Sequence, residues 1–226
     1  MLKKLFIVTC CVLATVGFVR ATQQTSARDL YLNYPSASSA SSGGGQTGRP
    51  GSKVQIERNR NGNLSFVSPK ATFLNGDKIA FRTSLNFSGY LTVINLGTSG
   101  RITPLYSGQV TAGRDIRVPA QGWITVAGPA GKEVVNFIMS TGNPFQGASI
   151  QPTQSGNSGS VSFNTSTGQA ASDNDIQSIL NDANARALSN GRDLVPETQG
   201  NDTYVLTSSA QSLSQPVGFS ITLNHK

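Results

Sequence analysis

The sequence predicts a mostly β protein: an Ig-like antiparallel β-sandwich with one inserted amphipathic helix at about residues 172–189. Short runs of alternating apolar and polar residues recur from residue 53 onward. Glycine-rich turns separate them at roughly the 8–12-residue spacing of sandwich folds, which argues against βαβ units. The 226 residues are 37% hydrophobic and 13% charged, which excludes a wholly disordered chain and a coiled coil.

The first 21 residues have the pattern of a signal peptide. Two lysines precede an apolar run over residues 5–19, and Val19 and Ala21 occupy the −3 and −1 positions of a cleavage site. The apolar run is shorter than the roughly 20 residues that span a bilayer. We therefore expect cleavage after Ala21 and export to the periplasm or the extracellular space, with no transmembrane segment in the mature chain.

Both cysteines, Cys10 and Cys11, fall within this predicted signal peptide. The mature chain would then contain no cysteine, which excludes disulfides, thiol nucleophiles and cysteine-ligated metals. Its stability would have to come from apolar burial.

The charge is unevenly distributed along the chain. Residues 22–149 hold 12 basic and 5 acidic side chains, whereas residues 150–226 hold 3 basic and 6 acidic ones. The basic part could face an anionic envelope surface or polymer, or it could supply ordinary solubility charge.

Two segments of different character precede the predicted sandwich. Residues 22–34 form a short N-terminal segment whose apolar run at 30–34 could dock on the body of the protein, dock on a partner or stay frayed. Residues 35–52 are rich in serine and glycine without apolar periodicity, which predicts a flexible linker.

Residues 53–226 predict a single β-sandwich domain. Val54 and Ile56 alternate with polar residues, and the Asn61–Asn63 turn and a second alternating run complete a hairpin. Residues 79–86 alternate as in a half-buried strand, and residues 90–96 are apolar on both faces, which indicates a central strand. Further strands are predicted at 102–106, 116–118, 123–127, 134–139, 203–207 and 217–224.

The polar residues 142–171 predict a long surface loop with at most a short strand at 161–163. Ser172 is a suitable N-cap for the helix that follows, with Asp175 completing a capping box. Apolar residues recur at helical spacing through residue 188, so we expect one face of this helix to pack on the core.

The stretch from Gly76 to Ser140 resembles the bacterial domain-of-unknown-function family 4384 (DUF4384). The pattern consists of turn glycines and prolines, core positions and a few polar residues around the predicted strands. The matching residues are Gly76, Asp77, Gly89, Tyr90, Leu91, Asn95, Gly100, Leu105, Tyr106, Pro119, Pro129, Gly131 and Glu133. The sequence departs from the family pattern at Tyr106–Ser107, where Phe-Pro is common.

The resemblance carries limited functional information. Such domains occur in secreted and envelope proteins or beside enzyme domains, and they are regarded as interaction or accessory modules without an assigned reaction. The resemblance therefore implies a stand-alone, exported, non-catalytic member of the family.

Known catalytic and metal-binding motifs are incomplete in this sequence. Residues 156–160 look like the nucleophile turn of a serine protease, but the single histidine, His225, follows them and stands in the wrong order. Residues 128–133 lack the spacing of a P-loop, and residues 173–175 lack the glycine and glutamate of a calcium loop. We expect no catalytic residue, no cofactor and no metal; a hydrolase would need His225 beside an acid and a hydroxyl in one cleft.

Aromatic and arginine side chains are the candidates for a ligand or partner surface, because aromatic rings beside arginines can bind sugars or single-stranded nucleic acid. These candidates are Tyr90, Trp123, Arg82, Arg101, Arg114 and Arg117. Export argues against nucleic acid as the partner. Tyr90 and Trp123 could equally be core residues of the sandwich.

Two functions follow from this sequence. The first is an exported module that binds another protein or the cell envelope, and the alternative is a module that binds carbohydrate of the cell wall or surface. Aromatic rings exposed together on one sheet face would favour sugar. Buried aromatic residues with an unpaired sheet edge would favour protein.

Overall fold

A computed structural model describes residues 26–34, 48–144, 151–154, 161–164, 174, 176–178, 180–181, 195–207 and 213–226. The predicted signal peptide lies outside these residues. The elements are α1 (Ala27–Leu32), β1 (Gly51–Arg60), β2 (Asn63–Val67), β3 (Thr72–Phe73), β4 (Lys78–Leu85), β5 (Gly89–Leu96), β6 (Ile102–Val110), β7 (Ile116–Val118), β8 (Ile124–Thr125), β9 (Gly131–Ser140), β10 (Gln151–Gln154), β11 (Val161–Asn164), β12 (Val195–Gln199), β13 (Asp202–Leu206) and β14 (Val217–His225).

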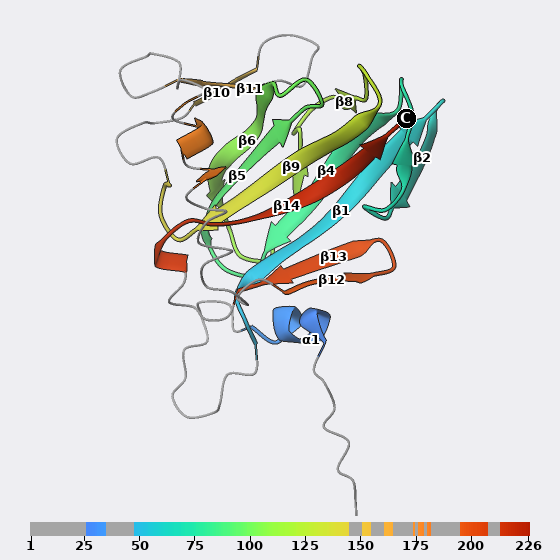
Figure 1. Cartoon of the computed structure of the whole chain (residues 1–226). Coiled ribbons are helices and arrows are strands. Elements are labelled where there is room, and N and C mark those ends of the chain that lie inside the picture. The colour runs from blue at the N-terminus through green and yellow to red at the C-terminus, as the bar shows by residue number, and fades with distance from the viewer. Residues whose placement is uncertain are drawn as a thin grey trace, which may run out of the picture.

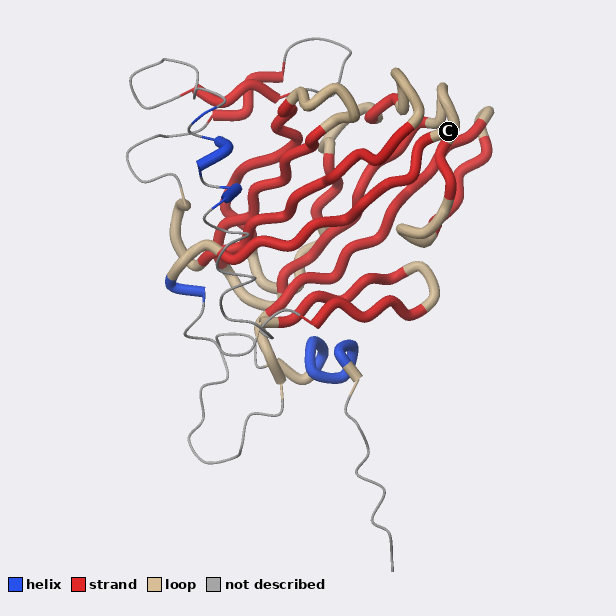
Figure 2. Tube along the Cα trace, viewed as in Figure 1, coloured by secondary structure: helices blue, strands red, loops and turns tan. Residues whose placement is uncertain are grey.

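Most strands belong to two sheets that form the body of the molecule (Figures 1 and 2). Sheet A has the order β12-β13-β1-β4-β7, with β2 paired to the second half of β1 and β8 paired to the start of β4. Sheet B has the order β3-β14-β9-β5-β6. All described pairs are antiparallel except β3–β14. The predicted mostly β sandwich is confirmed, and its Ig-like topology stays a prediction.

Buried apolar side chains from the two sheets meet in one core. Phe137 on β9 is fully buried, and its ring lies 5.5 Å from that of Phe81 on β4 and 5.0 Å from that of Phe219 on β14. Full burial of one such side chain stabilises a fold by about 1.5–3 kcal/mol. The alternation recognised in the sequence is therefore the pattern that fills the space between the sheets.

The boundary between the predicted linker and the domain lies earlier than expected. β1 begins at Gly51, inside the predicted linker, and Ser52 is buried with its Oγ 3.0 Å from Thr83 Oγ1. A Cβ atom at Gly51 would collide with the carbonyl oxygen of Val205, so glycine permits close pairing of β1 and β13 here. Residues 35–47 of the predicted linker lie outside the described residues.

The predicted long loop at 142–171 contains a hairpin of β10 and β11. β10 was not predicted, because its four residues lack apolar alternation and include Pro152. The short strand expected at 161–163 corresponds to β11.

Part of the predicted helix at 172–189 is described, and residues 174, 176–178 and 180–181 are helical. Ile176 and Leu180 pack against Ile94 on β5 and Ile138 on β9. These two strand residues alternate with residues of the main core, so the helical residues cover the outer face of sheet B. The other residues of the predicted helix lie outside the described part of the chain.

Residues 26–34 of the short N-terminal segment dock on the body of the protein, which is one of the alternatives left open by the sequence. α1 lies beside the β12–β13 hairpin (Figure 1), with Ala27 and Tyr31 packed against Tyr204 and Leu206. Asn86 holds the segment in place. Its Nδ2 donates to the carbonyl oxygens of Tyr31 and Arg49, at 2.9 and 2.7 Å, and its Oδ1 accepts from the Gly51 N–H at 2.8 Å.

We expect Tyr31→Phe to lower the free energy of unfolding by about 1 kcal/mol, the usual net value of a buried hydrogen bond. The Tyr31 hydroxyl donates to the Ser84 carbonyl oxygen at 3.2 Å, and burial raises the pKa of this phenol. Urea unfolding measures the change. Tyr34→Phe is the control, because the Tyr34 hydroxyl has no hydrogen bond to the described residues and its loss should leave stability unchanged. Equal effects of the two variants would contradict the docking contact.

Candidate functional site

The outer face of sheet A carries an ion-pair cluster centred on Glu57 of β1. The Glu57 side chain is only 3% exposed, and it bonds through Oε1 to Arg82 Nε and through Oε2 to Arg117 Nε, the latter at 2.9 Å. Arg82 on β4 and Arg117 on β7 are opposite each other in the ladder. Burial alone would raise the pKa of Glu57, but the hydrogen bonds from the two guanidinium groups outweigh it and lower that pKa.

Arg117 is held from several directions. Its NH1 group donates to the carbonyl oxygens of Pro119 and Gly122 at 3.0 and 2.8 Å, and its guanidinium carbon lies 4.4 Å from the centre of the Trp123 ring. The Arg82 side chain remains 43% exposed. The cluster therefore presents one fixed arginine, one accessible arginine and an indole ring at the surface.

Two exposed apolar side chains extend this surface along β2. The Asn61–Gly62 turn has positive φ at both residues, as a two-residue type I′ hairpin requires, and it sets Phe66 opposite Glu57. Directly opposed residues share a face of a sheet. Leu64 and Phe66, 60% and 42% exposed, therefore lie on the same face as the Glu57 cluster. We call Leu64, Phe66, Arg82, Arg117 and Trp123 the sheet A platform.

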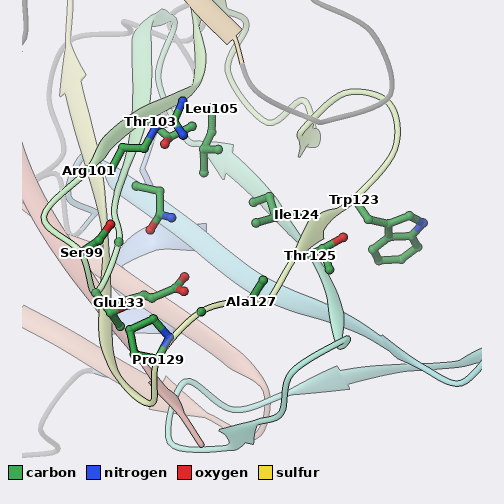
Figure 3. Close-up of a pocket in the computed structure, with 14 residues that line it drawn as sticks. Ser99, Arg101, Thr103, Leu105, Trp123, Ile124, Thr125, Ala127, Pro129 and Glu133 are labelled. Atoms are coloured by element: carbon green, nitrogen blue, oxygen red, sulfur yellow. The ribbon is translucent and has the colours of Figure 1, made fainter.

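A second candidate site is a cavity of about 470 Å³ at one end of the sandwich. It lies between the ends of β5, β6 and β9 in sheet B and the β8 segment of sheet A (Figure 3). The Glu133 carboxylate points from β9 toward the segment holding Ile124 and Ala127, and the Trp123 ring lies at the far side. Glu133 is 8% exposed, and the buried Oδ1 of Asn95 has no hydrogen-bond partner among the described residues.

The structure brings together three of the six candidate residues that the sequence suggested. Arg82, Arg117 and Trp123 meet on the sheet A platform. Arg101 lines the cavity instead. Tyr90 is half-buried on β5 of sheet B, and Arg114 is exposed in the turn after β6.

Sequence reasoning missed Glu57 and Phe66 as site residues. Counting outward from the Asn61–Gly62 turn would have paired them, because a two-residue hairpin fixes the register of its strands. It also missed Asn95 and Glu133, which were noted only for the family resemblance. Their common inward direction depends on the pairing of β5 with β9, and no local pattern shows that pairing.

The described residues contain no group of three or more His, Cys, Asp or Glu side chains that could hold a metal. His225 Nε2 lies 3.1 Å from the amide oxygen Oδ1 of Asn75. Within the described part of the chain, no helix has the length and apolar character to cross a bilayer.

Comparison with known proteins identifies the middle of the chain. Residues 72–143 match the family described as "Domain of unknown function (DUF4384)". This segment is similar to that family. The match confirms the resemblance found over Gly76–Ser140. No curated protein and no solved structure matches the chain.

The DUF4384 segment contributes strands to both sheets, from β3 through β9. Its strands are completed by partners outside the match. β1 pairs along β4, and β14 pairs with both β9 and β3. Glu133, Asn95 and Trp123 all lie within the segment, whereas Glu57, Leu64 and Phe66 lie before it. The platform therefore joins family and non-family residues, and the lining of the cavity comes from the family segment.

Proposed function

We propose that the protein is an exported, non-catalytic β-sandwich module that binds a protein of the cell envelope through the sheet A platform. The signal-peptide pattern supports the export. One observation carries the binding proposal: Leu64 and Phe66 are exposed on the same sheet face as Arg82 and Arg117, the two arginines that pair with Glu57. Aromatic and arginine side chains beside apolar contacts are the residues that dominate the energy of protein interfaces.

The charge of this face indicates the chemistry of the partner. Glu57 is paired with two arginines, so the cluster keeps one net positive charge. Lys78 also lies on this face, opposite Asn59, which is two positions from Glu57 on β1. A partner surface with acidic side chains beside apolar ones would match both the charge and the exposed apolar area.

Binding of cell-wall or surface polysaccharide is the second candidate. Phe66 and Trp123 support it, because they place two surface rings on one sheet face. Arg117 covers one face of the Trp123 ring, so only the opposite face of that ring could stack on a sugar.

Crosslinking of tagged protein in intact cells tests the proposal, followed by identification of what co-purifies from the envelope fraction. We expect one reproducible protein partner, and we expect its recovery to fall about tenfold with Phe66→Ser, the loss typical of an interface anchor. Leu74→Ser is the matched control. Leu74 is 43% exposed against 42% for Phe66, but it lies in the turn after β3.

Equal recovery of the partner with Phe66→Ser and with Leu74→Ser would contradict the assignment of the platform as the binding surface. A different outcome would favour the carbohydrate alternative over this proposal. In that outcome no protein partner is found, the protein is retained on wall polysaccharide, and Trp123→Ala abolishes the retention.

A further inference from the structure

We infer that the cavity at the end of the sandwich binds the primary ammonium group of a small organic molecule. The cavity shares Trp123 with the platform, but the inference rests on Glu133, Asn95 and Thr103, which are not platform residues. The cavity volume of about 470 Å³ falls in the range of roughly 300–1,000 Å³ that is usual for small-molecule sites.

The first observation is a buried carboxylate without a cation. Glu133 is 8% exposed, at an inward position of β9 opposite Leu223. The described ion pairs involve Glu57 and Asp77, and none involves Glu133. Arg101 also lines the cavity, but Figure 3 shows its guanidinium directed toward Thr103 and Leu105 and away from Glu133. Buried carboxylates are normally paired with a cation, and no described side chain supplies one to Glu133. We therefore expect the cation to come from a bound ligand.

The second observation is an orphaned acceptor at the same place. Asn95 Oδ1 is buried and has no partner among the described residues. Thr103 is directly opposite Asn95 in the β5–β6 ladder, and its hydroxyl side chain also lines the cavity. A buried amide oxygen is almost always hydrogen-bonded, so a ligand that donates hydrogen bonds would satisfy it.

A primary ammonium group fits this set of acceptors. It carries one positive charge and three N–H donors, which suits one carboxylate, one amide oxygen and one hydroxyl. Leu105, Ile124 and Ala127 add apolar wall for the carbon chain next to the nitrogen. A calcium ion is a poorer match, because it takes 6–8 oxygen ligands and the described lining offers a single carboxylate.

Titration of the full ¹⁵N-labelled chain, followed by amide NMR at pH 7, tests the inference. We expect n-butylamine to shift the Asn95 side-chain amide and the backbone amides of 124–127 saturably, and n-butanol to produce no saturable shift. Glu133→Gln should weaken n-butylamine binding at least tenfold. Asp115→Asn is the matched control, because it removes one exposed carboxylate beyond the opposite end of β6 and should leave the affinity unchanged.

Asn95→Asp provides an independent variant if Glu133→Gln does not fold, and its second carboxylate should tighten binding of n-butylamine several-fold. No saturable shift with n-butylamine would overturn the inference, and so would equal affinity in Glu133→Gln and the unmodified chain. Calcium chloride causing the same shifts at lower concentration would assign the cavity to a metal ion instead. Phe66→Ser should bind n-butylamine with unchanged affinity. The ligand inference and the proposed platform function can therefore fail independently of each other.

Discussion

Phe137→Ala is expected to lower the free energy of unfolding by about 3–5 kcal/mol, the range found when a buried phenylalanine is truncated. The Phe137 ring has no exposed surface, and it contacts rings of both sheets: Phe81 edge-on at 5.5 Å and Phe219 stacked at 5.0 Å. Truncation would leave a cavity between the two sheets. The backbone ladders within each sheet keep the strands from moving inward to fill it. Many domains have only about 5–15 kcal/mol of total stability, so this variant should be close to unfolding.

Denaturant unfolding with the single tryptophan, Trp123, as the fluorescent probe measures this effect. Phe66→Ala is the control, because it removes the same side chain from a position that is 42% exposed. Its change should be clearly smaller, about 1 kcal/mol, since a side chain that is 42% exposed loses less apolar burial than Phe137 does. A similar midpoint for the two variants would show that the sheets do not pack through Phe137.

Asp77→Asn is expected to lower the free energy of unfolding at pH 7 by about 1–2 kcal/mol, the value of a charge-assisted hydrogen bond reduced for solvent screening. Asp77 is 2% exposed and accepts two hydrogen bonds from Arg60, at 2.7 and 2.6 Å, and one from the Leu74 N–H at 3.0 Å. The Arg60 side chain is 36% exposed, so solvent screens the ion pair and lowers its expected contribution to stability. Asparagine keeps the shape and one acceptor but loses the charge.

The pH dependence of stability distinguishes this ion pair from a purely structural contact. The hydrogen bond from Arg60 is the largest cause that lowers the pKa of Asp77 below its ordinary value of 3.8 in the folded protein. A lowered carboxyl pKa stabilises the fold fully above pH 3.8, and this contribution is lost as the pH falls through the folded-state pKa. The difference between the unmodified protein and Asp77→Asn should therefore be constant near neutrality and shrink below about pH 4.

Thermal unfolding from pH 7 to pH 2 follows this difference. The exposed Asp115→Asn substitution should leave the acid branch of the curve unchanged. Parallel curves for the unmodified protein and Asp77→Asn over the whole range would mean that Asp77 is not ionised and paired in the folded state.

Local patterns predicted much of this fold. Alternation identified β4 as a strand, and apolar residues on both faces identified β5 as a central strand. The Asn61–Asn63 turn identified the hairpin of β1 and β2. The start of β1 was placed late because Gly51 and Ser52 look like linker residues, and only their contacts with Val205 and Thr83 show why they are in a strand. These contacts join positions more than 30 residues apart, and local composition carries no signal of them.

The candidate sites were likewise predictable where local chemistry identified them, and not where distant strand pairing formed them. Arginines and an indole were recognised as a possible surface from their chemistry, and β4–β7 pairing brought Arg82 and Arg117 together. Glu57, which organises them, is an isolated acid in the sequence and offered no pattern to recognise. Glu133 looked like part of a turn, because its burial depends on the strands that surround it in sheet B.

The placement of β14 has a consequence for how the protein is made. β14 lies between β3 and β9 in sheet B. The residues of β3 and β9 that pair with β14 precede their partners in the sequence by about 80 to 150 residues. A nascent chain that has not reached residue 217 therefore exposes the β9 edge and the core face that Phe219, Ile221 and Leu223 would cover. Pairings this distant in sequence slow folding and leave strand edges open to aggregation. Completion of the sandwich must therefore follow synthesis of β14.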